Sequence, residues 1–292
     1  MPPETHFFSS FASDLIQRRK FPLTGSDLRE ELESFRELES SKGIVMDDDD
    51  VIDGLGNAAA SPFELFEAIV RSLSGKASVL GEKTPGHLLW WRAIARAAPW
   101  MRFVIVARDP RAVVASSLSM PWRDTYDVSS FHGRRHLVFA ARWMFDQETA
   151  SALLATLGPG RCLLLRYEDV VADPQASRND IASFLGLDAT ATPQAAPAGI
   201  VLPWEPWKQS ALGEVRSDRL TAWGDDLPAL EAAQVAAICS KGMRQLRYSE
   251  GRPGAVRAAW IRARMGPEVT RELRGYLDGY RKNDRYIRSI SL

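Results

Sequence analysis

The sequence contains few residues of the kinds that mark disulfide-rich or metal-binding proteins. Its 292 residues include two cysteines and four histidines, and two cysteines in a chain of this length do not form a disulfide framework. We therefore expect Cys162 and Cys239 to be reduced and the protein to be cytoplasmic. The 37 basic and 37 acidic residues give a formal net charge of zero, which argues against nucleic acid or an anionic membrane as a partner. An anion would have to be bound by a local site.

Long apolar runs and common catalytic motifs are also missing. No segment approaches the roughly 18 to 20 apolar residues that span a bilayer, and the first residues show no charged leader followed by an apolar stretch. The sequence contains no GxxxxGK[ST], GxGxxG, HExxH, CxxC or GxSxG motif, so a nucleotide phosphate loop and the usual metal and hydrolase sites are not indicated.

Two kinds of apolar pattern alternate along the chain. The continuously apolar, β-branched segment at 102–107 predicts a strand buried on both faces, and the segment RCLLLRYEDVV at 161–171 predicts a second buried strand. Helical spacing predicts helices at 61–74, 87–99, 109–118, 136–157, 175–185, 228–248 and 253–282. Strands that alternate with helices predict an α/β fold, a parallel sheet flanked by helices with helical additions. We expect one domain over residues 1–250 and a basic helical extension over 251–292 packed on it. The proline-rich stretch 188–216 is expected to be a loop.

The stretch FVIVARDPRAVVASS at 103–117 places an arginine directly after a predicted strand. Ligands of open parallel sheets collect beyond the carboxyl ends of the strands, where helix N-termini point their N–H groups. Asp109 is suited to cap the next helix, so Arg108 is expected beside an anion there. Ser116 follows two helical turns later and could reach the same anion. The alternative is that Arg108 pairs with Asp109 or Glu168.

A second polar segment, GEKTPGH at 81–87, precedes another predicted helix, and Lys83 in it could place a compact charge at a reacting anion. Together with other segments it resembles the sulfotransferases that use 3′-phosphoadenosine 5′-phosphosulfate (PAPS), and most of all the branch that includes bacterial sulfotransferases and the tyrosylprotein sulfotransferases. The resemblance extends to about Tyr248 and depends on the order of its motifs, which are PPETHFF at 2–8, GEKTPGH at 81–87, RFVIVARDPRAVVASS at 102–117, LLRYEDVVADP at 164–174 and RLTAW at 219–223.

The resemblance implies a nucleotide site with PAPS as donor, 3′-phosphoadenosine 5′-phosphate (PAP) as product and no metal. Arg108 and Ser116 fall where the family holds the 3′-phosphate, and Tyr167 falls where it contacts the adenosine or its phosphate. The family's first strand and its turn for the 5′-phosphosulfate lie upstream of the Pro-Glu-Thr string, and no counterpart precedes Glu4. Either the true start lies upstream, the chain is shortened, or the loop is lost. We expect this N-terminal truncation to expose the apolar neighbours of the missing strand. Either another segment or a partner covers them, or the protein is poorly active.

The resemblance also implies a catalytic group. Glu4 falls at the position of the base, Lys83 at a lysine near the transferring sulfuryl group, and Thr221 at a serine that stabilises the same charge. A cation and a base suffice for sulfuryl transfer to a hydroxyl, because positioning and electrostatics carry most of the rate. Partial burial of Glu4 would weaken its acidity and make it a stronger base. His6 and His87 are alternative bases, since cytosolic relatives carry a histidine there.

The sequence is compatible with two rival functions. One is a nucleotide-dependent phosphotransferase, and the other is a non-catalytic or weakly active nucleotide-binding remnant of the same fold. The acceptor is expected to be a small molecule or another acceptor that carries a hydroxyl group.

Other signals have structural explanations. The run Asp47–Asp50 is expected to be a solvated acidic loop, not a calcium site. The stretch 123–136, with His132 and His136, is either a substrate lid or a surface loop. Trp204, Trp207 and Trp223 either pack a loop or line an acceptor pocket. The segment from Arg252 to Arg288 carries ten basic and four acidic residues, which predicts a solvated amphipathic helix or else a homodimer contact or a surface for an acidic partner.

Overall fold

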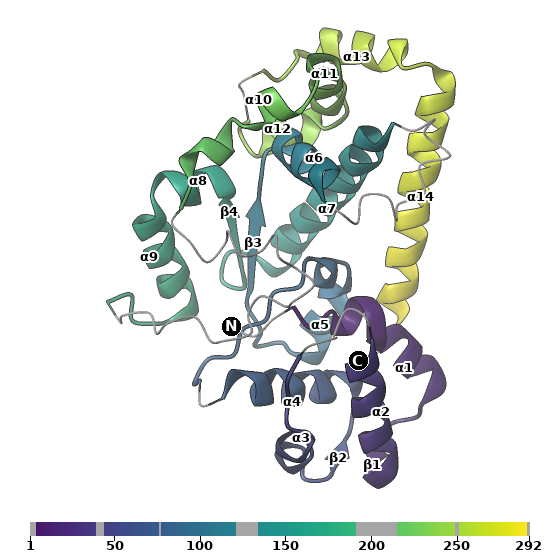
Figure 1. Cartoon of the computed structure of the whole chain (residues 1–292), viewed down its shortest axis with the longest axis vertical. Helices are drawn as coiled ribbons and strands as arrows, with labels where there is room; N and C mark the ends of the chain where they lie inside the picture. The colour runs from purple at the N-terminus through teal and green to yellow at the C-terminus, as the bar shows by residue number, and fades with distance from the viewer. Residues whose placement is uncertain are drawn as a thin grey trace. The chain divides into compact units, whose positions relative to one another are not determined.

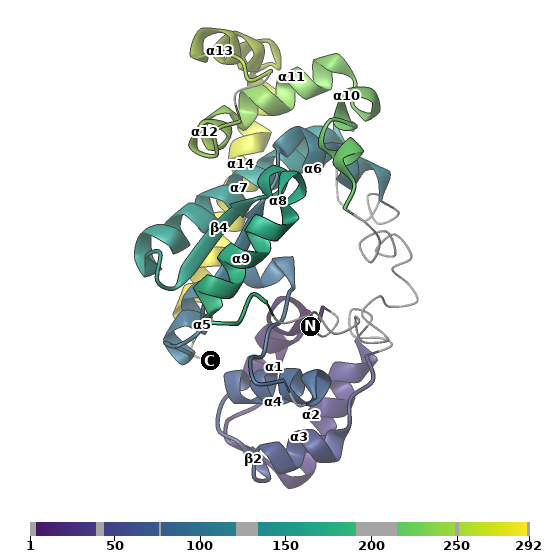
Figure 2. The ribbon, with the colours of Figure 1, turned by 90° about the vertical axis from the view of Figure 1, so that its left-hand side faces the viewer.

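The computed structural model describes residues 4–38, 44–75, 77–120, 134–190, 215–248 and 251–290. The chain forms two compact units (Figures 1 and 2). Unit 1 comprises Met1–Trp100, Thr192–Glu214 and Ile287–Leu292, and unit 2 comprises Met101–Ala191 and Val215–Tyr286.

Unit 1 is a helical body with two short antiparallel strands. Its elements are α1 Ala12–Arg18, β1 Leu23–Thr24, α2 Gly25–Glu37, α3 Asp48–Gly54, β2 Ala58–Ala59, α4 Pro62–Ser74 and α5 Trp91–Ala97. A π-helical turn at Phe7–Phe11 precedes α1, and a 3₁₀ helix at Pro85–Trp90 precedes α5.

Aromatic side chains from segments far apart in the sequence form the core of unit 1. The ring of Phe7 lies 5.4 Å from Phe66 and 6.0 Å from Phe35, and the ring of Phe8 lies 4.6 Å from Phe66 and 5.0 Å from His87. Phe7 and Phe8 are fully buried. Edge and tilted contacts at these distances are favourable beyond the burial of area alone, so the two phenylalanines fix the amino-terminal segment to α4.

Helix α4 confirms the prediction for residues 61–74, because Ser61 accepts a hydrogen bond from the Glu64 N–H at 3.2 Å and Pro62 occupies the first turn. Glu64 in turn accepts a hydrogen bond from the Ala60 N–H at 2.7 Å. This reciprocal capping satisfies N–H groups that a helix start would leave unpaired.

Unit 2 contains the parallel sheet. Its elements are β3 Phe103–Ala107, α6 Pro110–Ser119, α7 Arg135–Leu157, β4 Cys162–Arg166, α8 Tyr167–Ala172, α9 Pro174–Leu185, α10 Trp223–Asp226, α11 Ala229–Ile238, α12 Ser240–Gln245 and α13 Ala255–Arg264, and α14 follows at Pro267–Ser289. A 3₁₀ turn at Ser217–Leu220 precedes α10.

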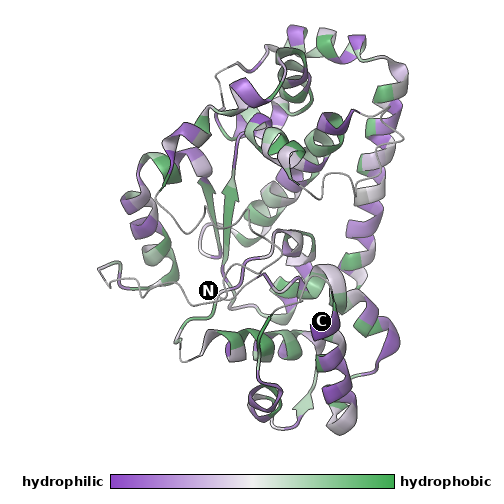
Figure 3. Cartoon of the chain, in the orientation of Figure 1, coloured by the Kyte–Doolittle hydropathy of each residue, from purple (hydrophilic) through white to green (hydrophobic). Residues whose placement is uncertain are grey.

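Strands β3 and β4 pair in parallel, with Phe103 opposite Cys162 and Ala107 opposite Arg166. Helices α8 and α9 lie on one side of these strands and α6 and α7 on the other (Figures 1 and 2). Both strands are mainly hydrophobic, whereas α14 is largely hydrophilic (Figure 3). The predicted α/β architecture, a parallel sheet flanked by helices, is confirmed, and both strands end with their carboxyl ends at the same edge.

The expectation that both predicted strands are buried is wrong. In β4 only Cys162 is buried and the other four residues are partly exposed, and β3 has one exposed face. Val104 is 39% exposed and Val106 is 54% exposed. These side chains share one face of the strand, and β3 is an edge of a two-stranded sheet among the described residues. The second strand is also shorter than predicted, because helix α8 begins at Tyr167. The apolar pair Val170 and Val171, which continues the strand pattern in the sequence, lies in this helix, and Val171 is its buried residue.

Three further expectations are corrected. The acidic run is not a loop: Asp47 caps α3 by accepting hydrogen bonds from the N–H groups of Asp49 and Asp50. Acidic side chains in a first turn are favoured by the helix dipole. The predicted helix at 87–99 begins as a 3₁₀ helix and becomes α-helical at Trp91. The long helices predicted at 228–248 and 253–282 are each divided in two, the second at Gly266, where φ is 91° and a proline follows.

Unit 2 has a core built by α6, α7, α11 and α12, on which part of α14 also packs. Gly242 in α12 allows a close approach there: a Cβ at this position would lie 2.7 Å from Cζ3 of Trp143 and 3.0 Å from Cγ of Gln147. Helix α12 therefore touches α7 through a glycine.

We expect Gly242→Ala to destabilise the protein. Overpacking costs roughly 1–3 kcal/mol, and the better helix propensity of alanine returns up to about 1 kcal/mol, so the net loss should be about 1–2 kcal/mol. Urea denaturation measures this difference. Gly275→Ala in α14 is the matched control, because no atom lies within 4 Å of its Cβ position. Equal shifts in the two variants would contradict the close contact.

Candidate active site

Unit 1 brings the predicted base and lysine together. The Glu4 carboxylate forms an ion pair with Lys83 Nζ, and its other oxygen lies 3.4 Å from Nε2 of His6. The side chain of Glu4 is 11% exposed and that of Lys83 is 55% exposed. Residues 4–8 and the GEKTPGH segment, distant in the sequence, thus form one cluster with a mostly buried carboxylate and an accessible cation.

Glu82 is the group that joins these two segments. Its Oε1 accepts hydrogen bonds from the N–H and the hydroxyl of Thr5, both at 2.9 Å, and from the hydroxyl of Thr84 at 2.6 Å. Its Oε2 lies 3.0 Å from Nδ1 of His87. Sequence analysis did not single out Glu82. The nearby polar residues Thr84 and His87 were the only local signal for its role. Its bonds to Thr5 join residues 77 positions apart, so the sequence pattern could not reveal them.

His87 is engaged at both ring nitrogens. Its Nε2 accepts a hydrogen bond from the Phe8 N–H at 3.2 Å, and its Nδ1 faces Glu82. A nitrogen that accepts from an amide carries no proton, so the Nδ1–H tautomer donates to Glu82. Both nitrogens hold the amino-terminal segment in place, which leaves Glu4 and His6 as the candidate bases on this cluster.

The network of Glu82 predicts a dependence of stability on pH. Burial acts to raise the pKa of Glu82, but the bonds from His87, Thr84 and Thr5 together outweigh it and hold the pKa below its ordinary value. A depressed carboxylate pKa stabilises the fold above the ordinary pKa of about 4.3, and this stabilisation is lost as the pH falls through the lower folded value.

We therefore expect wild type to be more stable than Glu82→Gln at neutral pH. The difference in the free energy of unfolding should shrink in the acid range below the ordinary carboxylate pKa. Thermal unfolding of both proteins between neutral and acid pH measures it. A difference that is constant with pH would show that the charge of Glu82 does not contribute.

In unit 2, the backbone around Arg108 is held on both sides. The Arg108 carbonyl accepts a hydrogen bond from Nε1 of Trp143 at 3.0 Å, and the Asp109 N–H donates to Glu168 Oε1 at 2.9 Å. The Arg108 guanidinium lies over the ring of Tyr167, with its carbon 4.6 Å from the ring centre. Stacking of this kind orients the planar cation.

Glu168 and Asp109, the two carboxylates considered as partners of Arg108, have other contacts. The second oxygen of Glu168 accepts a hydrogen bond from the hydroxyl of Tyr248 at 2.7 Å. Burial and this bond raise the pKa of Tyr248. Asp109 caps α6 through the Arg111 N–H at 2.8 Å and binds the Arg111 side chain with Nη2–Oδ2 at 2.6 Å.

Arg111 also links the RLTAW segment to the start of α6. Its guanidinium carbon lies 4.0 Å from the ring centre of Trp223, and the ring packs partly into the core of unit 2. Thr221 is exposed two residues before this tryptophan. Ser116 lies partly exposed on α6, one turn before its end at Ser119. Arg108, Tyr167 and Trp223 thus belong to one set of contacts that follows the ends of the two parallel strands.

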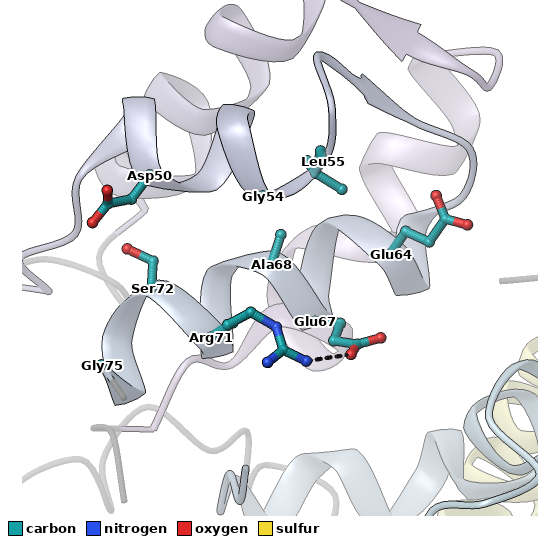
Figure 4. Close-up of a pocket in the computed structure, with 9 residues that line it drawn as sticks. All are labelled: Asp50, Gly54, Leu55, Glu64, Glu67, Ala68, Arg71, Ser72 and Gly75. Atoms are coloured by element: carbon teal, nitrogen blue, oxygen red, sulfur yellow. Dashed lines mark hydrogen bonds and ion pairs between the residues drawn. The ribbon is translucent and has the colours of Figure 1, made fainter. Parts of the chain in front are cut away.

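A pocket of about 690 Å³ lies elsewhere in unit 1, between α3 and α4 (Figure 4). Three carboxylates line it, but Glu64 caps α4 and Glu67 pairs with Arg71 at 3.0 Å. None of the predicted site residues lines this pocket. It is therefore separate from the Glu4 cluster.

Other predicted groups are accounted for as follows. Both cysteines are free and buried, and burial raises the pKa of Cys162 to about 11, so neither thiol is poised as a nucleophile. His136 lies in α7, where Nε2 contacts Oε1 of Gln234 at 2.8 Å. The rest of the lid expectation, and Trp204 and Trp207, fall outside the described residues.

Two absences apply to the described residues alone. Within them, no three His, Cys, Asp or Glu side chains are grouped so that they could hold a metal ion. In the same part of the chain, no helix has both the length and the apolar character of a membrane span.

The protein thus combines an α/β fold with two clusters. One contains an arginine stacked on a tyrosine at the end of a parallel strand, and the other contains a carboxylate–lysine pair. A family model described as "Sulfotransferase family" matches residues 2–191. The chain belongs to the sulfotransferase family. The matched range contains four of the five motif segments and ends before RLTAW.

A solved structure is similar in fold. It is described as "Sulfotransferase Domain from the Curacin Biosynthetic Pathway", with a TM-score of 0.54, 16% sequence identity, and coverage of 85% of this chain and 88% of that chain. At this identity the likeness concerns the fold. No curated protein matches the sequence.

Proposed function

We propose that the protein transfers a sulfuryl group from PAPS to a hydroxyl of an acceptor molecule. The observation that carries this proposal is the arrangement of Arg108, whose backbone is held by Trp143 and Glu168 and whose guanidinium is stacked on Tyr167. A fixed, stacked guanidinium at the carboxyl end of a parallel strand is suited to a phosphate group.

The residues present fit the 3′-phosphate of PAPS. Arg108 offers planar donors for two phosphate oxygens, and Ser116 offers a hydroxyl from the helix that begins one residue after Asp109. Tyr167 supports the guanidinium by stacking against it, and we propose that it also contacts the adenosine or its phosphate. We assign these three residues to the nucleotide.

Bound PAPS would supply the electrophilic sulfuryl group and a leaving phosphate. Glu4 then has the task of taking the proton from the acceptor hydroxyl, so the O–H bond breaks as its oxygen becomes the nucleophile. Lys83 supplies positive charge for the oxygens on which negative charge grows, and its ion pair with Glu4 holds the cation and the base side by side. We assign Thr221 to the same charge as a hydroxyl donor.

A turnover assay tests this function directly. The protein is incubated with PAPS and panels of phenols, aliphatic alcohols and tyrosine peptides, and PAP release and sulfated product are followed by mass spectrometry. Sulfation of a member of the panel, with PAP formed in equal amount, is the expected result. PAP that binds without turnover on any acceptor would favour the non-catalytic remnant, and turnover with ATP in place of PAPS would favour a phosphotransferase.

A further inference from the structure

A single buried carboxylate fixes the backbone beside both members of the Glu4–Lys83 pair. Glu82 has a side-chain exposure of 6% and precedes Lys83 directly. Two of its bonds come from Thr5, the residue directly after Glu4, whose N–H and hydroxyl both donate to Oε1 at 2.9 Å. Thr5 is fully buried, so the bonded backbone has no water to replace a lost partner.

A second link runs through Thr84. Its hydroxyl donates to Glu82 at 2.6 Å and accepts a hydrogen bond from the His6 N–H at 3.2 Å. His6 has a positive φ of 51°, a left-handed backbone conformation that is uncommon in residues other than glycine. Two successive peptide N–H groups after Glu4 are therefore held by one connected set of polar groups.

The set requires a carboxylate at position 82. Oε1 accepts three donors, and Oε2 faces the protonated Nδ1 of His87, whose Nε2 accepts from the Phe8 N–H. An amide has one oxygen, so with glutamine its NH₂ would face the His87 Nδ1–H. If the histidine changed tautomer, its Nε2–H would instead face the Phe8 N–H. Either arrangement loses a hydrogen bond.

We infer that Glu82 is a positioning residue for the reaction, which holds Glu4 and Lys83 in contact through the backbone of Thr5 and His6. This inference rests on the proposed function. It adds to it a residue that touches neither donor nor acceptor and that sets the geometry of the base and the cation together.

The test compares Glu82→Gln with Glu31→Gln. Glu31 is the matched control because it is also a buried carboxylate of unit 1, fully buried and bonded to Arg18 and Arg19 at 2.6–3.0 Å. It holds α1 and α2 and has no bond to the Glu4 cluster. Each protein is assayed at the same interval below its own Tm, so that loss of stability alone does not separate the two.

We expect Glu82→Gln to lower kcat for sulfuryl transfer by roughly 10²-fold, the size of effect that a small misplacement of catalytic groups produces. The KM for PAPS should stay within about twofold, because the nucleotide residues belong to unit 2. Glu31→Gln should keep kcat within about twofold. Equal losses of kcat in the two variants, or an unchanged kcat in Glu82→Gln, would overturn the inference.

Thr5→Val is a second variant in case Glu82→Gln does not fold. It removes the hydroxyl that donates to Glu82 and that accepts a long hydrogen bond from the Phe7 N–H at 3.4 Å, and it keeps the side-chain shape and the Thr5 N–H. We expect a loss of kcat of about tenfold, smaller than in Glu82→Gln, because one charge-assisted bond is lost and the other bonds of Glu82 remain. A Thr5→Val protein with wild-type kcat would count against the inference.

A readout without turnover separates this inference from the proposed function. An ammonium held against a carboxylate acylates slowly, so loosening the pair should raise the rate of Lys83 acetylation by acetic anhydride, followed by mass spectrometry with the exposed Lys241 as internal reference. We expect a rise of severalfold in Glu82→Gln and no change in Glu31→Gln. Unchanged Lys83 labelling in Glu82→Gln would overturn the positioning role even if PAPS proves to be the donor. Faster labelling in a protein without PAPS turnover would refute the proposed function alone.

Discussion

Glu4→Gln should lower kcat by roughly 10² to 10⁴-fold, the contribution of a well-placed general base. The side chain is 11% exposed and lies between Lys83 and His6, so glutamine fits the same space and keeps a hydrogen-bonding oxygen for the lysine. What it removes is the ability to accept a proton. PAP binding should remain within about twofold in calorimetry, which shows that the fold and the nucleotide residues are intact.

His6→Gln is the control that separates the two candidate bases. His6 lies within 3.4 Å of Glu4 and is 26% exposed, so it too could meet an acceptor. A loss in His6→Gln that equals or exceeds the loss in Glu4→Gln would move the base to the histidine. A loss in Glu4→Gln alone supports the carboxylate.

Arg108→Ala should weaken PAP binding by roughly 10²-fold or more. A hydrogen bond to a charged group contributes about 1.5–3 kcal/mol, and a guanidinium that binds phosphate with two such bonds accounts for at least that factor. The Arg108 backbone is held by Trp143 and Glu168 independently of the side chain, so alanine should leave the strand end in place. Calorimetry with PAP measures the loss.

Arg102→Ala is the matched control for this variant. Arg102 stands directly before β3, at its amino end, and is likewise stacked on an aromatic ring, with its guanidinium carbon 5.8 Å from the ring centre of Phe184. We expect its replacement to leave PAP binding within about twofold. If both variants weakened binding equally, the effect would come from general loss of charge or stability and not from a phosphate site at Arg108.

The helices with strong local signals could be predicted from the sequence. Ser61 and Asp109 are capping residues beside a proline, and the structure uses both side chains as caps. The parallel pairing of β3 and β4 followed from alternation of strands and helices. The helix caps depend on residues close together in the chain, and the pairing of the two strands was inferred from the order of local strand and helix patterns.

Features that depend on distant partners could not be predicted in this way. The exposure of Val104 and Val106 depends on how many strands flank β3, and the run after Arg166 becomes helical although its valines continue the strand pattern. The network of Glu82 depends on Thr5, which only the fold brings near. The acidic run at Asp47 was misjudged for a local reason: acidic residues at a helix start look like a solvated loop unless the cap is recognised.

The candidate site was therefore only partly accessible from sequence. The Glu4–Lys83 and Arg108–Tyr167 contacts join residues that resemblance to a family had already selected. The sequence did not single out Glu82, and it offered Glu168 only as a side-chain partner of Arg108. Both contribute through hydrogen bonds to the backbone of a distant segment, which the sequence pattern does not reveal.

The most direct measurement is a calorimetric comparison of PAP with adenosine 5′-phosphate, which differ only in the 3′-phosphate. If Arg108 binds that phosphate, the wild-type protein should prefer PAP by roughly 10²-fold, and Arg108→Ala should remove most of the preference. Equal affinity of the wild-type protein for the two nucleotides would contradict a 3′-phosphate site at the end of β3.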